Sequence, residues 1–169
     1  IDFAVDPAFR PLTGLEPIHR QIAQMTQLLT SLVAMARLDS LSSLTLNPVN
    51  LNPTLVGVVK GLQPEINAKK LTVDIDVSDG RLMVNADAAE LAQALERIVI
   101  NAVQFTPEGG HIRVVAGADG ENIVIAIGDS GIGIAPDDLP RIFTRFYRGD
   151  KVGTTRGFGL GLSIASRII

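Results

Sequence analysis

The sequence predicts an α+β fold: a two-layer α/β sandwich in which helices cover one face of a mixed, mostly antiparallel sheet, preceded by a long bundle-type helix. Two observations predict it. After residue 48, segments with the apolar spacing of a helix alternate with short segments in which every second residue is apolar. Before residue 40, apolar residues recur about every 3.5 residues, which is typical of a helix in a bundle.

The composition of the 169 residues narrows the functional classes. No cysteine is present, which excludes disulfide frameworks and cysteine-based zinc sites. The net charge is −3 and the basic residues are scattered, so we expect no nucleic-acid binding and no membrane contact. No apolar run reaches the roughly 18–20 residues that cross a bilayer, so we expect a cytoplasmic segment, whatever anchor a longer parent carries. An apolar content of 46% predicts a surface covered by a partner chain.

Residues 1–48 are predicted to hold part of an interaction helix and a linker to a second domain at 49–169. The polar stretch at 40–48 contains the boundary. No other helix of this type exists in the chain to cover the apolar stripe, which favours a homodimer through the helix at 18–39. The alternative is an amphipathic helix that packs on its own domain. The stripe consists of Ile18, Ile22, Met25, Leu29, Leu32 and Ala36.

The second domain begins with a helix and two strands. Asn52-Pro53 indicates an N-cap followed by a first-turn proline, and Pro64 should kink the helix or end its first part. The segment 71–77 alternates apolar and polar residues, as a half-buried strand does. Asp79-Gly80 then predicts a hairpin turn into a strand at 82–86. The buried face of the helix is expected at Leu55, Val59, Leu62 and Ile66.

A long helix, two strands and two further helices complete the predicted domain. Asp87 caps the long helix. The strands are expected at 111–116 and 123–128, joined by a glycine-rich turn. A short helix is expected at 136–146 and a final one from Leu160 onward. The apolar stripe of the long helix is expected at Leu91, Leu95, Ile98, Ala102 and Phe105.

Four short motifs lie in this domain, and their order and spacing indicate one pocket for ATP and magnesium. They are an Asn-bearing helix at 95–110, an Asp-Gly loop at 129–134, an aromatic-basic stretch at 142–150 and a glycine loop at 157–162. Asn101 lies at the centre of the first motif. Its neutral amide oxygen is a hard ligand suited to Mg²⁺, which takes its other ligands from water and phosphate.

The Asp-Gly loop and the glycine loop have the chemistry to bind a base and its phosphates. An ionised Asp129 has only acceptors, so it can bind the adenine amino group and repels the guanine carbonyl. Gly131 and Gly133 allow the backbone to approach a flat base. The glycine loop comes just before a helix, whose unpaired N–H groups attract phosphate. Its glycines are Gly157, Gly159 and Gly161.

With these motifs, residues 50–169 resemble the catalytic ATP-binding domain of sensor histidine kinases, in the GHKL superfamily with its Bergerat-type fold. Residues 18–48 resemble the second helix of the dimerisation and histidine-phosphotransfer hairpin. The resemblance implies a protein-histidine kinase of two-component signal transduction. It implies ATP and Mg²⁺ as cofactors, with a histidine phosphotransfer domain and a response regulator as partners. The acceptor histidine is not in this chain, because the phosphoacceptor motif is absent.

The resemblance also assigns roles to single residues. The catalytic residues are Asn101, which holds Mg²⁺, and Arg148, which contacts the γ-phosphate. Asp129 selects adenine. The remaining nucleotide-binding positions are Gln104, Phe105, Gly131, Gly133, Ile134, Gly157, Gly159, Leu160 and Gly161.

The chain departs from the family pattern beside Asn101. Many family members have an Asn where this chain has Arg97, and a Lys where it has Gln104. The loss of that lysine should weaken phosphate binding unless Arg97 supplies the charge (hypothesis). Family members also continue past the position of Ile169 with two strands, so we expect an exposed sheet edge.

Two alternative functions remain open at the level of the sequence. One is a nucleotide-sensing or degenerate GHKL module that changes its dimer contacts without phosphotransfer. The other is a GHKL serine kinase of the anti-sigma type. The interaction helix at 18–39 favours the histidine kinase over the serine kinase, whereas Arg97 and Gln104 keep the sensing module open.

Overall fold

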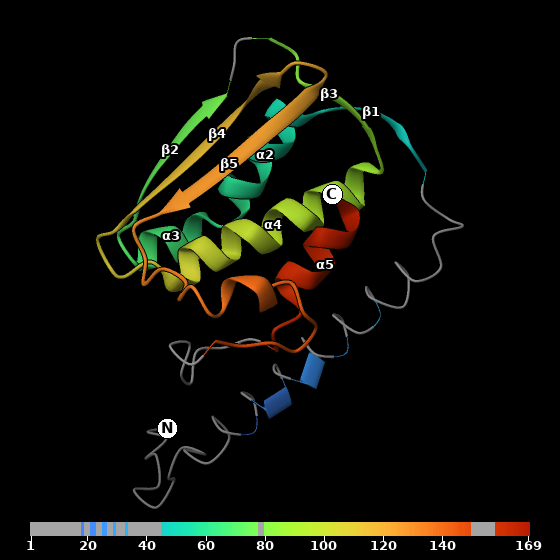
Figure 1. Ribbon diagram of the computed structural model, residues 1–169. Helices are drawn as coiled ribbons and strands as arrows, with labels where there is room; N and C mark the ends of the chain where they lie inside the picture. Colours follow the sequence, from blue (N-terminus) through green and yellow to red (C-terminus); the bar gives the residue numbers. More distant parts are fainter. Residues whose placement is uncertain are drawn as a thin grey trace, which may run out of the picture.

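The computed structural model describes residues 45–77, 80–149 and 158–169, together with Ile18, Gln21, Ile22, Met25, Thr26, Leu29 and Val33. The rest of the predicted helix at 18–39 lies outside the described residues, as do Asp79 and Gly157. The elements follow one another in Figure 1 as β1 (Asn47–Asn50), α2 (Leu51–Gly61), α3 (Gln63–Ala68), β2 (Thr72–Val77), β3 (Met83–Ala86), α4 (Ala88–Phe105), β4 (His111–Asp119), β5 (Asn122–Asp129), the 3₁₀ helix η2 (Leu139–Arg141) and α5 (Gly161–Ile168).

The strands form two sheets, and the main one is mixed as predicted. Its order is β2-β4-β5, with β2 parallel to β4 and β4 antiparallel to β5. The predicted hairpin between the strands at 71–77 and 82–86 is wrong. β3 pairs instead with β1, antiparallel, so that Asn50 lies opposite Met83. A four-residue strand with alternating apolar residues fits any neighbour, and its own sequence does not specify which one.

Helices α2, α3 and α4 lie on one face of the main sheet, and α5 lies beside α4 (Figure 1). This confirms the predicted arrangement of a sheet covered by helices on one face. The core contains Leu55, Leu95 and Ile112, each no more than 1% exposed. Burying such a side chain contributes about 1.5–3 kcal/mol to the hydrophobic stabilisation of the fold.

The buried face of α4 differs in part from the predicted stripe. Ile98 and Phe105 were expected in the core but are half-buried. The core face is rotated away from both residues, which leaves them on the same side of the helix as Asn101. The buried residues of α4 are Leu91, Ala94, Leu95, Val99, Ala102 and Val103.

Three helix boundaries test the capping predictions. Asp87 caps α4 as predicted, and its side chain accepts hydrogen bonds from the amides of Ala89 and Glu90. The cap of α2 is Asn50 rather than Asn52, because the side chain of Asn50 accepts a hydrogen bond from the Asn52 amide. Pro64 lies in the first turn of α3 and separates it from α2, as predicted.

The segment 136–146 is not the helix that we predicted. It contains consecutive turns and the short 3₁₀ helix η2. Pro140 lies inside η2 and has no N–H to donate, which prevents a regular α-helical ladder there. Among the described residues, no helix has both the length and the apolar character needed to cross a membrane.

Candidate functional site

The first part of the site is the face of α4 that points away from the core. Asn101 is half-buried on this face, with Arg97 one turn before it and Phe105 one turn after it. The helix ends directly after Phe105. Thr106 adopts an extended conformation there, and its buried hydroxyl donates to the carbonyl of Ala102 at 2.6 Å. The backbone beyond the Asn-bearing turn is therefore held tightly.

The second part is the loop that leaves β5 at Asp129. The Oδ1 atom of Asp129 accepts a hydrogen bond from the amide of Gly131 at 2.8 Å, which closes a tight turn. Ser130 extends the pairing of β5 with β4. Its amide donates to the carbonyl of His111 at 3.0 Å, and its hydroxyl accepts from the amide of His111 at 2.9 Å. The Asp129 carboxylate is exposed at a fixed position at the end of the sheet.

The backbone carbonyl of Phe105 joins these two parts. It accepts a 3.4 Å hydrogen bond from the amide of Ile132. A Cβ atom on Gly131 would lie 2.6 Å from the same carbonyl oxygen and 2.5 Å from Oδ1 of Asp129. Only glycine allows this approach without a shift of the backbone. The Asp-Gly loop thus rests on the C-terminal end of the Asn-bearing helix.

The third part is the glycine loop before α5. Gly159 has a φ of +68°, and a Cβ atom on it would collide with the backbone of Phe146 and Tyr147. Gly161 begins α5 beside α4, where an added Cβ would lie 4.0 Å from that of Arg97. Leu160 is 2% exposed and packs with Ile164 in a small apolar cluster. The glycine loop therefore lies against both the Asn-bearing helix and the aromatic-basic stretch.

The aromatic-basic stretch is held against the residues that come just before it. The hydroxyl of Tyr147 donates to Oδ1 of Asp138 at 2.6 Å, and the guanidinium of Arg141 lies 4.3 Å from the centre of its ring. Phe143 and Phe146 are more than half exposed. Arg148 is exposed on the same stretch.

Apart from the buried Leu160, the predicted site residues that the structure describes fall into two groups. The first group lies on three linked segments: the second half of α4, and the Asp-Gly loop and the glycine loop, which both contact it. Its members are Asn101, Gln104, Phe105, Asp129, Gly131, Gly159 and Gly161. Ile134 and Arg148 lie on the connected loop between β5 and α5 and are exposed, and Gly133 on that loop has a φ of +64°. Figure 1 shows the described part of this loop, residues 130–149, leaving the end of β5 and passing beside α4.

Two basic residues that are not among the predicted site residues contact this region: Arg97, which the sequence offered only as a replacement charge, and Lys69, which it did not single out. Burial lowers the pKa of Arg97, while the carboxylates of Glu96 and Glu90 oppose that effect. Its Nε atom is buried and has no hydrogen-bond partner among the described residues. The ammonium of Lys69 donates to three carbonyls at the end of α4, those of Val103, Gln104 and Thr106. No local pattern marks Lys69, because its partners lie far from it in the sequence.

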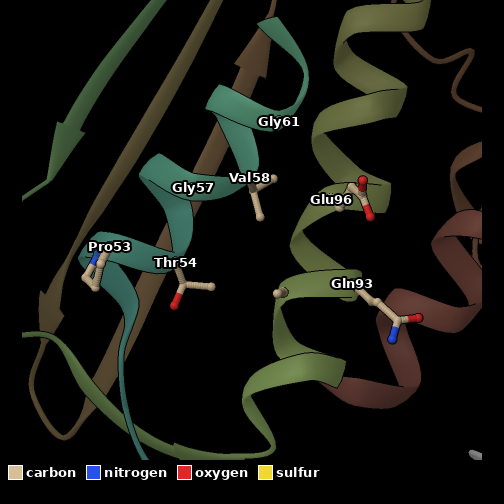
Figure 2. A pocket seen from close by; sticks show the side chains of 8 residues that line it. Pro53, Thr54, Gly57, Val58, Gly61, Gln93 and Glu96 are labelled. Atoms are coloured by element: carbon tan, nitrogen blue, oxygen red, sulfur yellow. The ribbon is translucent and has the colours of Figure 1, made fainter.

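A separate groove lies on the other side of α4. Its volume is about 420 Å³, and it is open between α2 and α4, where Thr54 and Val58 of α2 point toward α4 (Figure 2). None of the predicted site residues lines it. The lining residues are Pro53, Thr54, Gly57, Val58, Gly61, Ala92, Gln93 and Glu96.

The chemistry of the three parts fits a nucleotide better than a protein-held metal. The described residues contain no group of three His, Asp or Glu side chains that could hold a metal ion. Asn101 can supply one amide oxygen, which suffices for a Mg²⁺ ion that takes most of its ligands from water and phosphate. The start of α5 can supply backbone N–H groups for an anion.

Comparisons with known proteins point to the same chemistry. Residues 86–169 match the family described as histidine kinase-, DNA gyrase B- and HSP90-like ATPases. The phosphate regulon sensor protein PhoR of Pseudomonas aeruginosa is 31% identical over 172 residues, which cover 100% of this chain and 39% of PhoR. The chain spans less than half the length of the curated relatives that it matches, 39% of PhoR and 31% of the Escherichia coli sensor protein CreC.

Two solved structures are similar in both sequence and fold. Full-length ShkA in complex with AMPPNP is 34% identical, with a TM-score of 0.73, and the match covers 85% of this chain and 30% of ShkA. The nucleotide-free catalytic domain of the histidine kinase ThkA is 27% identical, with a TM-score of 0.66, and the match covers 74% of this chain and 80% of that domain.

Proposed function

Residues 86–169 of this chain belong to the histidine kinase-, DNA gyrase B- and HSP90-like ATPase family, and we propose that they bind ATP in the catalytic core of a sensor histidine kinase. The kinase transfers the γ-phosphoryl group of ATP to a histidine on a separate phosphotransfer segment. Such a transfer depends mainly on positioning and on stabilisation of charge, so a pocket built from several short segments suffices on the enzyme side.

The contact between Ile132 and the Phe105 carbonyl carries this proposal. It joins the loop that begins at Asp129 to the helix that bears Asn101. In the proposed complex the Asp129 carboxylate accepts a hydrogen bond from the adenine amino group, and Gly131 and Gly133 lie beside the base. The N–H groups at the start of α5 bind phosphate oxygens, and Asn101 contributes its amide oxygen to Mg²⁺. Arg148 adds positive charge near the terminal phosphate.

The structure of ShkA with AMPPNP, an analogue of ATP, supports ATP as the ligand. A direct test is a thermal-shift titration of this chain with ATP, GTP and ADP, each with and without Mg²⁺. We expect ATP with Mg²⁺ to raise the melting temperature and GTP to leave it unchanged, since ligands that bind only the folded state stabilise it. Equal protection by GTP would contradict the assigned role of Asp129, and no protection by any nucleotide would contradict the proposal itself.

Phosphotransfer requires its own experiment. The chain is incubated with radiolabelled ATP and a separate histidine phosphotransfer hairpin. Acid-labile label on the hairpin is the expected result, because phosphohistidine is hydrolysed in acid. ATP binding without any labelling of the hairpin would contradict the kinase and favour a sensing module, and acid-stable label would indicate a serine kinase.

We further propose that the parent kinase is a homodimer through the helix at 18–39 and that it passes its phosphoryl group to a response regulator. Five apolar helical residues in this segment support a dimer, because each is at least 50% exposed in the single chain. They are Ile18, Ile22, Met25, Leu29 and Val33. Light scattering should give the mass of a dimer for the native chain and of a monomer for the double variant Met25→Glu, Leu29→Glu. A native monomer would contradict this part of the proposal.

A further inference from the structure

Lys69 reaches across the molecule to the end of the Asn-bearing helix. It follows α3 directly, and its half-buried ammonium donates three hydrogen bonds, at 2.9 Å to the carbonyl of Val103 and at 2.8 Å to those of Gln104 and Thr106. An ammonium group has three donors, so all of them are used. The carbonyl of Lys69 also accepts a hydrogen bond from the amide of Gly109 at 2.9 Å. The side chain and the backbone of Lys69 therefore both bind the segment 103–109, where α4 ends.

The end of α4 needs such a partner. The last carbonyls of a helix have no partner within the helix and together have a partial negative charge. The residue four positions after Val103 is Pro107, which has no N–H to donate. Thr106 is extended, so the usual glycine cap is absent. The Lys69 ammonium satisfies these carbonyls with charge-assisted hydrogen bonds.

The peptide groups that Lys69 holds lie on either side of the one that supports the Asp129 loop. The carbonyls of Gln104 and Thr106 bind the ammonium, and the carbonyl of Phe105 between them accepts from the Ile132 amide. The backbone of Gly131 lies close to that carbonyl, since a Cβ atom built on it would be only 2.6 Å from the oxygen. A rotation of these peptide groups would therefore move Asp129 relative to Asn101.

We propose that Lys69 is a positioning residue of the nucleotide site: by holding the end of α4, it fixes the spacing between the magnesium-binding amide of Asn101 and the adenine-binding carboxylate of Asp129. This inference rests on the proposed function. Lys69 does not touch the nucleotide. Its removal acts through the Phe105 carbonyl and loosens the loop even in the absence of ligand.

The neighbouring lysine provides a matched control. Lys70 carries the same charge and forms an ion pair with Glu108 at 2.6 Å, but the two side chains are 76% and 64% exposed. Ion pairs this exposed contribute little to stability. Lys70→Met therefore removes the same charge from the same turn without removing a hydrogen bond to the helix end.

The experiment compares the native chain with Lys69→Met, Lys69→Arg and Lys70→Met. Calorimetric titration gives the dissociation constant for ATP, and amide hydrogen exchange without nucleotide reports on the Gly131 and Ile132 N–H groups. For Lys69→Met we expect ATP to bind on the order of tenfold more weakly. Replacing a residue that orients the groups in contact with a ligand typically lowers affinity by this amount. We also expect the variant to exchange faster than the native chain at Gly131 and Ile132, and at the native rate at Val124 in the sheet. Lys69→Arg should restore part of the ATP affinity and part of the protection from exchange. Lys70→Met should behave as the native chain in both measurements.

Several outcomes would overturn the inference. One is an unchanged ATP affinity in a folded Lys69→Met variant. Another is exchange that is accelerated equally at Val124, since a general loss of stability then explains the weaker binding. If Lys69→Met does not fold, Lys69→Arg is measured in its place, and weaker ATP binding without faster exchange at Ile132 would then overturn the inference. If the native chain binds no ATP, the proposed function fails, and unchanged exchange at Ile132 in the variant would separately reject the positioning role.

Discussion

The backbone carbonyl of Phe105 accepts a 3.4 Å hydrogen bond from the amide of Ile132, which joins two segments that lie far apart in the sequence. One segment is the last turn of the helix that bears Asn101, and the other is the loop that follows Asp129. Each contains a motif that is weak alone. Their contact makes the two motifs parts of one site.

The first prediction concerns Gly131. In Gly131→Ala the new Cβ would lie 2.6 Å from the Phe105 carbonyl oxygen, so the loop must shift. Forcing a methyl group into such a contact typically costs about 1–3 kcal/mol. We expect ATP binding to weaken markedly, as measured by calorimetry. Gly117→Ala is the control, because an added Cβ there meets nothing within 4 Å. Equal ATP affinity of the two variants would contradict the proposed contact of the loop with the nucleotide.

The second prediction concerns Asp129. Asp129→Asn replaces an acceptor with a group that can place a donor against the adenine amino group. We expect ATP to give no thermal protection to this variant, while its melting temperature without ligand stays close to that of the native chain. Asp119→Asn, at the opposite end of the same β4–β5 hairpin, serves as the control. Continued protection of Asp129→Asn by ATP would mean that this residue does not select the base.

The third prediction concerns Arg97. Its guanidinium is half-buried, burial lowers its pKa, and its Nε atom has no partner among the described residues, so a bound phosphate would relieve an unfavourable burial. A hydrogen bond to a charged group contributes about 1.5–3 kcal/mol, so Arg97→Met should weaken ATP binding at least about tenfold. Calorimetry with adenosine provides the control, because a ligand without phosphates should bind both proteins equally. Unchanged ATP affinity would reject Arg97 as the replacement for the missing lysine charge.

The fourth prediction concerns pH and Asp87. Hydrogen bonds from the backbone amides of Glu90, Thr45 and Ala89 lower the pKa of Asp87 from its usual value of 3.8. The stabilisation from this carboxylate is therefore complete above pH 3.8 and is lost as the pH falls through the lower pKa of the folded state. Melting temperatures from neutral pH down into acid should show that the native chain exceeds Asp87→Ala at neutral pH and converges with it in acid. A difference that does not change with pH would contradict the assigned cause.

The sequence predicted those parts of the fold that depend on neighbouring residues. The start of α4 followed from Asp87, and the strands β4 and β5 followed from alternation on both sides of a glycine turn. β1 was not predicted, because Asn47–Asn50 contains a proline and two asparagines, which are rare in strands. It becomes a strand only through its pairing with β3, and that pairing is a tertiary contact.

The same limit applies to the site. Asp129 and Gly131 were predicted because a strand followed by Asp-Ser-Gly is a local pattern. The contribution of Lys69 was not predicted, because the carbonyls that it binds lie more than thirty residues away in the sequence and come close to it only in the folded chain. Arg97 was singled out only as a departure from a family pattern, and its buried Nε atom became evident from the packing of α5 on α4.

The close approach of Gly159 to Tyr147 has a practical consequence. Tyr147 is tied to Asp138, and Gly159 lies against the backbone of Tyr147, so two residues twelve positions apart in the sequence are held together. Lengthening a segment whose ends already meet adds only about 0.6 kcal/mol of closure entropy for each doubling. A reporter peptide or an affinity tag inserted at residues 150–156, before the glycine loop, should therefore leave the rest of the domain intact, which makes this position a convenient attachment point for labels.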